Sequence, residues 1–319
     1  MQRKEKVSII IQNWNGEKHL EECLTSIFRQ NYKNIEVIVV DSASRDKSVE
    51  LVKKKFKKVK IIALKKDRGA PYANNLGCTK STGKYIMFLN NDTKLQKDTI
   101  DKLVKKIQDE NEEVIVSPVQ LDWAGKRTGA GCPHYWIGGD LHKLFRIKGS
   151  KPFYLSISCC MLTRDMFNKN KFNENLFFYE EVEWSWRFHL KKIKIAIVEN
   201  SFFHHKVGGT VNSPKSAFNT GKSITATHFI CFKSHTFIFF LPLVFYNYIR
   251  LAVADMIRSK KPFYIKELAR GIASFVKNID KFSKERRNIQ KTRKVGDIEI
   301  IIDMIKSIGY VNSIIKTGG

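Results

Sequence analysis

The chain is 319 residues long, 43% of its residues are hydrophobic and its formal net charge at pH 7 is +26. This length accommodates one large domain with an appendage, or two domains, and allows a sizeable core. Six cysteines without a CxxC pair, and an N-terminal apolar run too short for a signal peptide, argue against a zinc framework and a secreted disulfide scaffold and favour a reducing compartment.

The first 110 residues alternate between strand and helix patterns. The strand-like runs are strongly apolar, as is typical of strands buried on both faces of a parallel sheet. The intervening segments carry apolar residues at helical spacing. This part of the chain therefore predicts an α/β fold with a Rossmann-like, mostly parallel sheet. The expected strands are 7–11, 35–41, 60–64 and 85–89, and the expected helices are 17–30, 46–56, 70–80 and 96–109.

Polar side chains follow three of these strands. Asn13, Asp41 and the run Asn90 to Asp92 each come at or just after a strand's carboxyl end. Any one of them alone is typical of a turn or a helix cap. Ligands of open α/β sheets bind at this edge, so agreement between three strands favours a ligand site.

Beyond residue 110 the alternation weakens. We expect strands at 114–118, 155–162 and 195–199, a loop entering a helix at 177–192, and a loop at 202–210. The segment 122–150 is rich in glycine and aromatic residues and is interpreted as a substrate loop.

The last third of the chain is apolar and basic. Residues 223–257 are dense in large apolar side chains, but the longest uncharged run, 234–249, falls short of the roughly 18–20 residues that a membrane span needs. Residues 281–294 carry seven basic residues against one acid, and from residue 201 onward there are 20 Lys+Arg against 7 Asp+Glu. This composition predicts attachment to an anionic membrane surface. The alternative is a buried helical subdomain with a solvated basic face.

Five motifs in order resemble the inverting family 2 glycosyltransferases of GT-A fold, with a rhamnosyltransferase-like branch as the closest type. The resemblance covers roughly residues 7–210. Together with the composition of the last third, it gives the expected organisation: a GT-A domain at 1–215 and a helical, basic and apolar, membrane-associating region at 216–319. The motifs are the opening segment 7–44, DRGAPYANNLG, GKYIMFLNNDT with SCCMLTRDMF, FFYEEVEWSWR and FFHHKVGG.

The resemblance implies a nucleotide-sugar site. Asp41 would contact the base of the nucleotide, and a carboxylate is suited to accept an N–H from a base edge. Asn13 and Glu17 would lie near the same cleft. Arg68 and Asn74 would lie close to the nucleotide. The family usually has Asn where Asp67 stands.

The same resemblance implies a divalent cation. Asn90, Asn91 and Asp92 occupy the three places of the family's DxD motif, with Asp92 as the metal ligand and the two asparagines facing the nucleotide sugar. His204 or His205 matches a downstream histidine that binds metal or phosphate. A nitrogen ligand would favour Mn²⁺ over Mg²⁺. The alternative for the histidine pair is a surface turn.

The acidic pair before residue 182 corresponds to the family's catalytic base. That position is Glu181, where most relatives have Asp, and Glu180 remains the alternative. Trp184 and Trp186 would stack on a sugar or base, or belong to the core. Arg187 would touch the diphosphate, or form an ion pair. Glu181 would deprotonate an acceptor hydroxyl for a single displacement with inversion.

Three other functions compete with this interpretation. A nucleotidyltransferase would usually show a Gly-rich basic loop after the first strand, where this chain has a single glycine. A nucleic-acid or polyanion-binding protein fits the charge, but no nucleic-acid motif occurs and nucleic acid is not an expected partner. A catalytically degenerate relative would bind a nucleotide sugar without turnover. We expect a transferase acting on a glycan or lipid-linked saccharide in the cytoplasm, at the inner face of the cell membrane.

Overall fold

The computed structural model describes residues 4–128, 152–206, 214–259, 263–304 and 306–307, and within them eight strands form one sheet in the order β3-β2-β1-β4-β7-β6-β8-β5. The strands are β1 (Val7–Asn13), β2 (Ile35–Asp41), β3 (Val59–Ala63), β4 (Tyr85–Asn90), β5 (Thr93–Leu95), β6 (Val114–Leu121), β7 (Cys159–Thr163) and β8 (Lys194–His205). The helices are α1 (Leu20–Phe28), α2 (Ser48–Lys55), α3 (Ala70–Thr79), α4 (Thr99–Gln108), α6 (Arg164–Lys169), α7 (Glu180–Leu190), α8 (Pro214–Cys231), α9 (Ser234–Ser259), α10 (Phe263–Lys277) and α11 (Ile279–Thr292).

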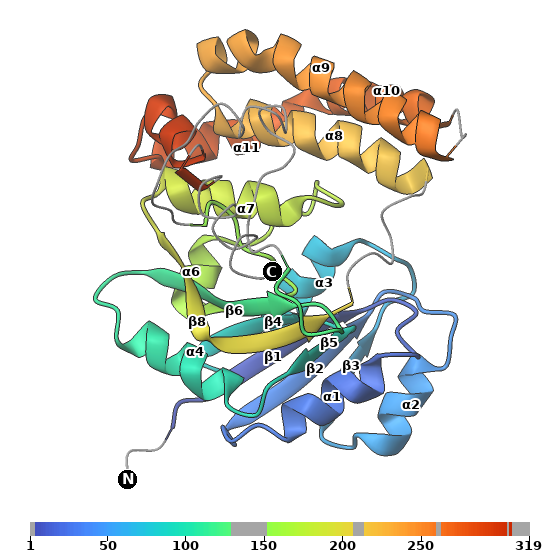
Figure 1. Ribbon diagram of the computed structural model, residues 1–319, viewed down its shortest axis with the longest axis vertical. Coiled ribbons are helices and arrows are strands. Elements are labelled where there is room, and N and C mark those ends of the chain that lie inside the picture. The colour runs from blue at the N-terminus through green and yellow to red at the C-terminus, as the bar shows by residue number, and fades with distance from the viewer. Residues whose placement is uncertain (1–3, 129–151, 207–213, 260–262, 305, 308–319) are drawn as a thin grey trace.

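The parallel, doubly covered sheet predicted for the first 110 residues is confirmed. Strands β3, β2, β1 and β4 are adjacent and parallel. Alternate residues of β1 enter two different cores, because successive side chains of a strand point to opposite faces. Ile9 and Ile11 pack with α1, whereas Ile10 packs in the cluster that includes Ala73 of α3. The expected helices form on both sides of these strands (Figure 1).

The second half of the sheet is mixed, and two sequence expectations there are wrong. Strand β7 begins at Cys159 rather than at residue 155 and runs antiparallel to β4 and β6. Of the expected loop at 202–210, residues 202–205 are strand, and residues 207–210 lie outside the described residues. A bulge at Pro118/Val119 lets β6 continue to pair with Phe202 to His204, and β5 pairs with β8 on the other side. Long-range pairing therefore extends β8 beyond its local pattern.

The C-terminal helices stack beyond α7, on the side away from the sheet (Figure 1). Helix α7 packs against α8, and the fully buried Trp186 of α7 lies against His228 of α8 and against Phe232, which directly follows α8. One hydrophobic cluster includes Val182, Leu190 and residues of α8, α10 and α11. Within the described part of the chain, no helix combines the length and apolar character needed to cross a bilayer.

Candidate active site

Three strand ends bring Asp41, Asn13 and Asn91 into one hydrogen-bonded row. Asn13 lies opposite Asp41 in the β1–β2 register and donates from Nδ2 to Asp41 Oδ1 at 2.7 Å. Asn91, just past β4, donates from Nδ2 to Asn13 Oδ1 at 2.7 Å. These residues were predicted to share the carboxyl edge of the sheet, and the structure places them there in direct contact.

Gly16 allows this row to form. A Cβ at Gly16 would lie 2.2 Å from Asn13 Oδ1 and 2.3 Å from Asn91 Nδ2. Neither atom can give way without breaking the bond between them. Only glycine therefore lets the loop after β1 pass so close to the asparagine pair.

Ser44 was not singled out from the sequence, yet it shapes the Asp41 site. Its hydroxyl donates to Asp41 Oδ1 at 2.6 Å and its backbone N–H to Oδ2 at 3.0 Å. With Asn13, these bonds occupy three of the roughly four acceptor positions of the Asp41 carboxylate, which is almost fully buried. The signal in the sequence was a serine three residues after Asp41, because an Asp side chain often accepts a hydrogen bond from an N–H two or three residues further on. Glu17 lies in the neighbouring loop, where its Oε2 accepts from the N–H of Lys47 at 3.2 Å.

The loop after β3 holds the other predicted nucleotide residues. The guanidinium carbon of the exposed Arg68 lies 3.5 Å from the centre of the Tyr72 ring. Asn74 is buried on α3. Asp67 accepts from the N–H of Gly69 at 2.9 Å and from Lys215 Nζ of α8 at 2.9 Å. The first turn of α8 is thereby tied to this loop.

The predicted metal ligands separate into two groups. His205 Nε2 lies 3.3 Å from Asp92 Oδ1 and 3.3 Å from Asn90 Nδ2, so it can donate to one or accept from the other, depending on its tautomer. His204 is the preceding residue of β8 and therefore points to the opposite face of the strand. Its ring lies against Trp123. The geometry pairs Asp92 with His205 and not with His204.

A cation at this position would find only part of its coordination in the protein. No group of three or more His, Cys, Asp or Glu side chains suited to a metal occurs among the described residues. Asp92 and His205 nevertheless offer one oxygen and one nitrogen side by side, a donor set that Mn²⁺ accepts. The buried Nδ1 of His205 has no hydrogen-bond partner among the described residues. The residues fit a cation that takes its remaining ligands from a bound diphosphate.

The acidic pair follows a turn of unusual backbone geometry. Phe178 and Tyr179 both have left-handed conformations, with φ of 72° and 60°. Such strain in consecutive non-glycine residues is concentrated at functional sites. Helix α7 starts directly after this turn, so Glu180 and Glu181 lie in its first turn.

The two carboxyl groups differ in their surroundings. Glu180 is 5% exposed and its Oε2 has no hydrogen-bond partner among the described residues, whereas Glu181 is half-buried. Burial, together with the negative charge of Glu181, raises the pKa of Glu180 to about 8. Burial also raises the pKa of Glu181. The Glu181 charge therefore opposes a second negative charge on Glu180 near neutral pH.

Contacts from both sides hold the strained turn beside the loop after β3. A Cβ at Gly69, whose φ is 87°, would lie 2.6 Å from the Phe177 ring. On the other side, Ser223 of α8 donates to the Phe177 carbonyl at 3.2 Å and Thr220 donates to the Tyr179 hydroxyl at 3.4 Å. The acidic pair is therefore positioned next to the Arg68 loop by α8.

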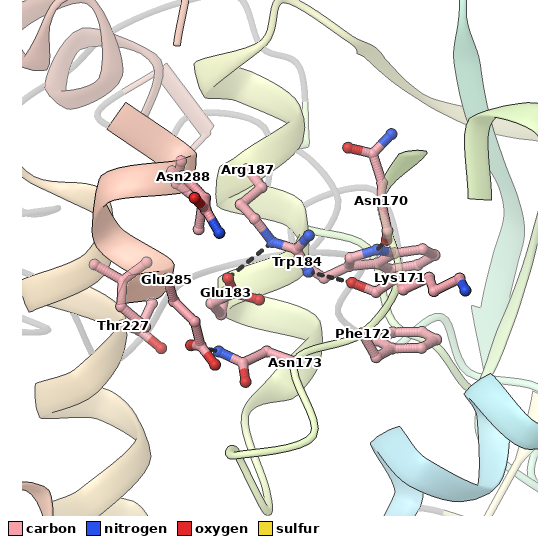
Figure 2. A network of polar contacts seen from close by, with 12 residues as sticks. Asn170, Lys171, Phe172, Asn173, Glu183, Trp184, Arg187, Thr227, Glu285 and Asn288 are labelled. Carbon is pink, nitrogen blue, oxygen red and sulfur yellow. Dashed lines mark hydrogen bonds and ion pairs between the residues drawn. The ribbon is translucent and has the colours of Figure 1, made fainter. Parts of the chain in front are cut away.

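The remaining predicted residues of α7 face the interior. Trp184 and Trp186 are fully buried, which confirms the core alternative for both. Arg187 is buried as well: its Nε lies 2.8 Å from Glu183 Oε1, and one NH2 group donates to the Lys171 carbonyl at 2.8 Å. Figure 2 shows this pair beside α11, where Glu285 accepts hydrogen bonds from Asn173 and Asn175. The ion-pair alternative therefore describes Arg187 as the structure has it, buried rather than on the surface.

Comparison with known proteins gives one family. The model of glycosyl transferase family 2 matches residues 8–171, about half of the chain. Glycosyltransferase GlyA of Streptococcus pneumoniae is 33% identical over 115 residues, which are 35% of this chain and 16% of that protein. The chain thus spans a small part of the length of this relative.

Two solved structures share the fold. S. aureus TarS 1-349 in complex with UDP-GlcNAc is 16% identical, with a TM-score of 0.56 over 97% of this chain and 91% of that one. The mannosyltransferase PcManGT of Pyrobaculum calidifontis, in complex with GDP-Man and Mn²⁺, is 15% identical, with a TM-score of 0.54 over 96% of this chain and 88% of that one. At these identities the likeness shows the architecture alone.

Proposed function

The chain belongs to glycosyl transferase family 2 and has the GT-A fold, and from this membership we propose that it transfers a sugar from a nucleotide-sugar donor to an acceptor hydroxyl with inversion. One observation carries the proposal. Polar ends of β1, β2 and β4 meet in a continuous hydrogen-bonded row, and two carboxyl groups of raised pKa lie at a strained turn docked on the neighbouring loop. A donor site and a base are the two parts that such a reaction requires.

The donor would bind along the carboxyl edge of the sheet. Asp41 retains acceptor capacity for an N–H of the base, with Asn13 and Ser44 fixing its orientation. Arg68, held over Tyr72, is an exposed cation at the same edge and suits a phosphate or the planar base. Glu17, Asn74, Asn90 and Asn91 complete the proposed contacts. Arg187 is not among them, because its charge is already paired with Glu183 in the interior.

A divalent cation, Mn²⁺ or Mg²⁺, would be held by Asp92 and His205 and would neutralise charge on the departing diphosphate. The Mn²⁺ in the mannosyltransferase structure supports this assignment by analogy. The tautomer of His205 matters for it: with the proton on Nδ1, the Nε2 lone pair faces Asp92 and is available. The cation would take that lone pair in place of the hydrogen bond from Asn90 Nδ2, because the ring nitrogen has only one lone pair.

Glu181 is the proposed base. It is more exposed than Glu180, so its carboxylate can meet an acceptor hydroxyl. It would take the hydroxyl proton while the acceptor oxygen bonds to the anomeric carbon, and the bond from that carbon to the phosphate oxygen breaks. The nucleoside diphosphate leaves with the electron pair. Glu180, buried beside it with a pKa of about 8, would stay protonated and so avoid a second negative charge.

The acceptor and the location are further parts of the proposal. The excess of basic residues after residue 200 supports an acceptor at an anionic surface, such as a lipid-linked saccharide or a glycan at the inner face of the cell membrane. The rhamnosyltransferase-like type stays a prediction. The proposed substrate loop at 122–150 lies largely outside the described residues.

Donor binding and turnover test the proposal together. Nucleotide sugars with UDP, dTDP and GDP are titrated against the full chain with and without Mn²⁺, following thermal stabilisation and release of nucleoside diphosphate. One donor should stabilise the protein, by about 2.7 kcal/mol at 100 times its Kd. Glu181→Gln should keep that stabilisation and lose turnover by about a hundredfold or more.

Three other outcomes would reject specific parts. A donor that binds without turnover by the unmodified chain would indicate a degenerate relative. Flat titrations combined with salt-sensitive binding to DNA would replace the transferase by a polyanion-binding protein. Loss of turnover in Glu180→Gln, with Glu181→Gln fully active, would assign the base to Glu180.

A further inference from the structure

The outward side of α9 is a continuous apolar face. Its large side chains recur at helical spacing and are strongly exposed: Phe239 is 77% and Ile257 is 71% exposed. Between them, over about 27 Å of helix, lie further apolar residues of the same side. We call this set the α9 face; its exposed members are Ile238, Phe239, Pro242, Tyr246, Ile249, Val253 and Ile257.

The opposite side of α9 is already packed. Val244 and Tyr248 are buried with Ile224 of α8 and Leu268 of α10. Helix α9 lies in the outermost layer of the molecule, and α8 lies between it and α7 (Figure 1). The α9 face is therefore turned away from the rest of the protein, and a soluble monomer rarely leaves so many large apolar groups together on its surface.

Exposed cations lie on the segments next to the α9 face, although one of them, Arg270, is ion-paired with Glu267 of α10. Lys233 is exposed just before the helix, and α10, which packs beside α9, exposes Lys266, Arg270 and Lys277. On α10 these cations alternate with the exposed Ile265 and Val276. An apolar face bordered by cations complements an anionic lipid surface, where acyl chains lie beneath negative headgroups. A second copy of this chain would instead bring two cationic borders together.

We propose that the α9 face rests on an anionic lipid bilayer, with α9 lying along the interface. Its aromatic and branched side chains would enter the boundary between headgroups and acyl chains, and the cations of α10 would contact the headgroups. The inference deepens the proposed function, because it names the surface at which the acceptor is met. Vesicle binding itself can be measured without sugar transfer.

Helix α8 connects this surface to the loop after β3, which carries Asp67 and Arg68. Its first turn contacts Asp67 through Lys215, and its middle carries Ile224, which packs under α9. Thr220 and Ser223 of the same helix hold the turn before the acidic pair. The bilayer would thus orient the loop after β3 and the acidic pair through one continuous helix.

Co-sedimentation with vesicles tests the proposal on the full chain without donor. The unmodified protein should bind vesicles of phosphatidylcholine with phosphatidylglycerol, and bind pure phosphatidylcholine more weakly. The variant Phe239→Ser/Ile249→Ser should weaken binding to the anionic vesicles by about tenfold or more. The matched control Ile298→Ser/Ile302→Ser removes two exposed isoleucines elsewhere in the basic C-terminal region and should bind within about twofold of the unmodified chain.

The variants are expected to fold normally, because the altered side chains are exposed. Thermal unfolding of each variant checks this. Equal binding by the α9 variant and the unmodified chain, or no binding to anionic vesicles at all, would overturn the proposal. So would a dimer in light scattering that the α9 variant abolishes, because the face would then belong to a second copy. Turnover on a soluble acceptor, measured separately, tells whether the sugar-transfer proposal stands independently of this result.

Discussion

The acidic pair shows how neighbouring residues acquire properties that neither has alone. Acids in the first turn of a helix normally gain from the helix dipole. Here burial outweighs that gain for both carboxyl groups, and the proximity of Glu181 adds to the rise in the pKa of Glu180. The left-handed turn at Phe178 and Tyr179 aims the start of α7 into this environment. Contacts from α8 and from Gly69 hold this strained turn in place. A helix that begins without strain would not need them.

The raised pKa of Glu180 makes stability fall as pH rises. The folded chain holds a proton on Glu180 up to about pH 8, whereas the unfolded chain releases it near the ordinary value of 4.5. The favourable contribution is fully present below pH 4.5 and is lost as pH rises through 8, by up to about 1.4 kcal/mol per pH unit. Glu180→Gln removes this titration. In urea denaturation its stability relative to the unmodified chain should increase steadily from pH 5 to pH 8.

Glu50→Gln, at an exposed position, provides the control. The pH dependence of its free energy of unfolding should parallel that of the unmodified chain. Parallel curves for Glu180→Gln and the unmodified chain would show that Glu180 is ionised in the fold, contrary to this prediction. The acid limb of the transfer rate should report the same pair, since the base must lose its proton to act.

At the scale of the element, strand alternation decides which histidine can bind a cation. Adjacent histidines look equivalent in the sequence, and a loop there would have left both available. Because β8 continues to His205 and pairs with both β5 and β6, His205 points to Asp92 and His204 to Trp123. The two histidines differ only in their place in the strand, and a shift of one residue would exchange their sides.

We expect His205→Ala to weaken the Mn²⁺-dependent part of donor binding by about tenfold or more. His204→Ala, one residue away on the opposite side of the strand, should leave it unchanged. Thermal stabilisation by the donor, with and without EDTA, measures both. Equal loss in the two variants would mean that the histidines act through the stability of β8 and not through the cation.

Beyond its first turn, helix α7 carries a buried ion pair that contributes to the stability of the fold. The Glu183 carboxylate and Arg187 are buried together, and burial raises the pKa of Glu183 even though Arg187 opposes the rise. Removing one partner leaves the other charge buried and alone. We predict that Arg187→Ala lowers the free energy of unfolding by about 3–5 kcal/mol, measured by chemical denaturation.

The double variant Arg187→Met/Glu183→Leu should recover most of that loss, because it removes both charges and fills the same space. The KM for the donor should stay unchanged in the double variant. A large rise in KM would instead place Arg187 at the diphosphate, as the family resemblance implied.

At the scale of the whole molecule, the GT-A part and the C-terminal helices share a core. Val182, Trp186 and Leu190 of α7 pack with residues of α8, α10 and α11. The proposed boundary at residue 215 falls in the first turn of α8, and most of α8 on one side of it packs against α7 on the other. Helix α8 also completes the site through Lys215, Thr220 and Ser223. Binding and stability are expected to depend on both parts.

A chain truncated after residue 215 should lose its cooperative thermal transition. It would expose Trp186, whose burial alone contributes about 4–6 kcal/mol by its area, and the neighbouring apolar side chains. Calorimetry and dye binding to exposed apolar surface measure this. A cooperative transition and unchanged donor binding in the truncated chain would show that residues 1–215 fold independently.

Local pattern is enough for the strands and helices of the first 110 residues, and for the polar strand ends that meet at one edge. Strand and helix periods are properties of short stretches, and parallel strands end at the same side by topology. The order of the motifs could also be recognised from the sequence, and the family that it suggested is correct. Partners remote in sequence were not readable: Asn91 and Asn13 are 78 residues apart, and Asn90 and His205 are 115 apart. The choice between His204 and His205, the burial of Arg187, the antiparallel β7 and the shared core of α7 and α8 arise from long-range packing, so only the folded chain decides them.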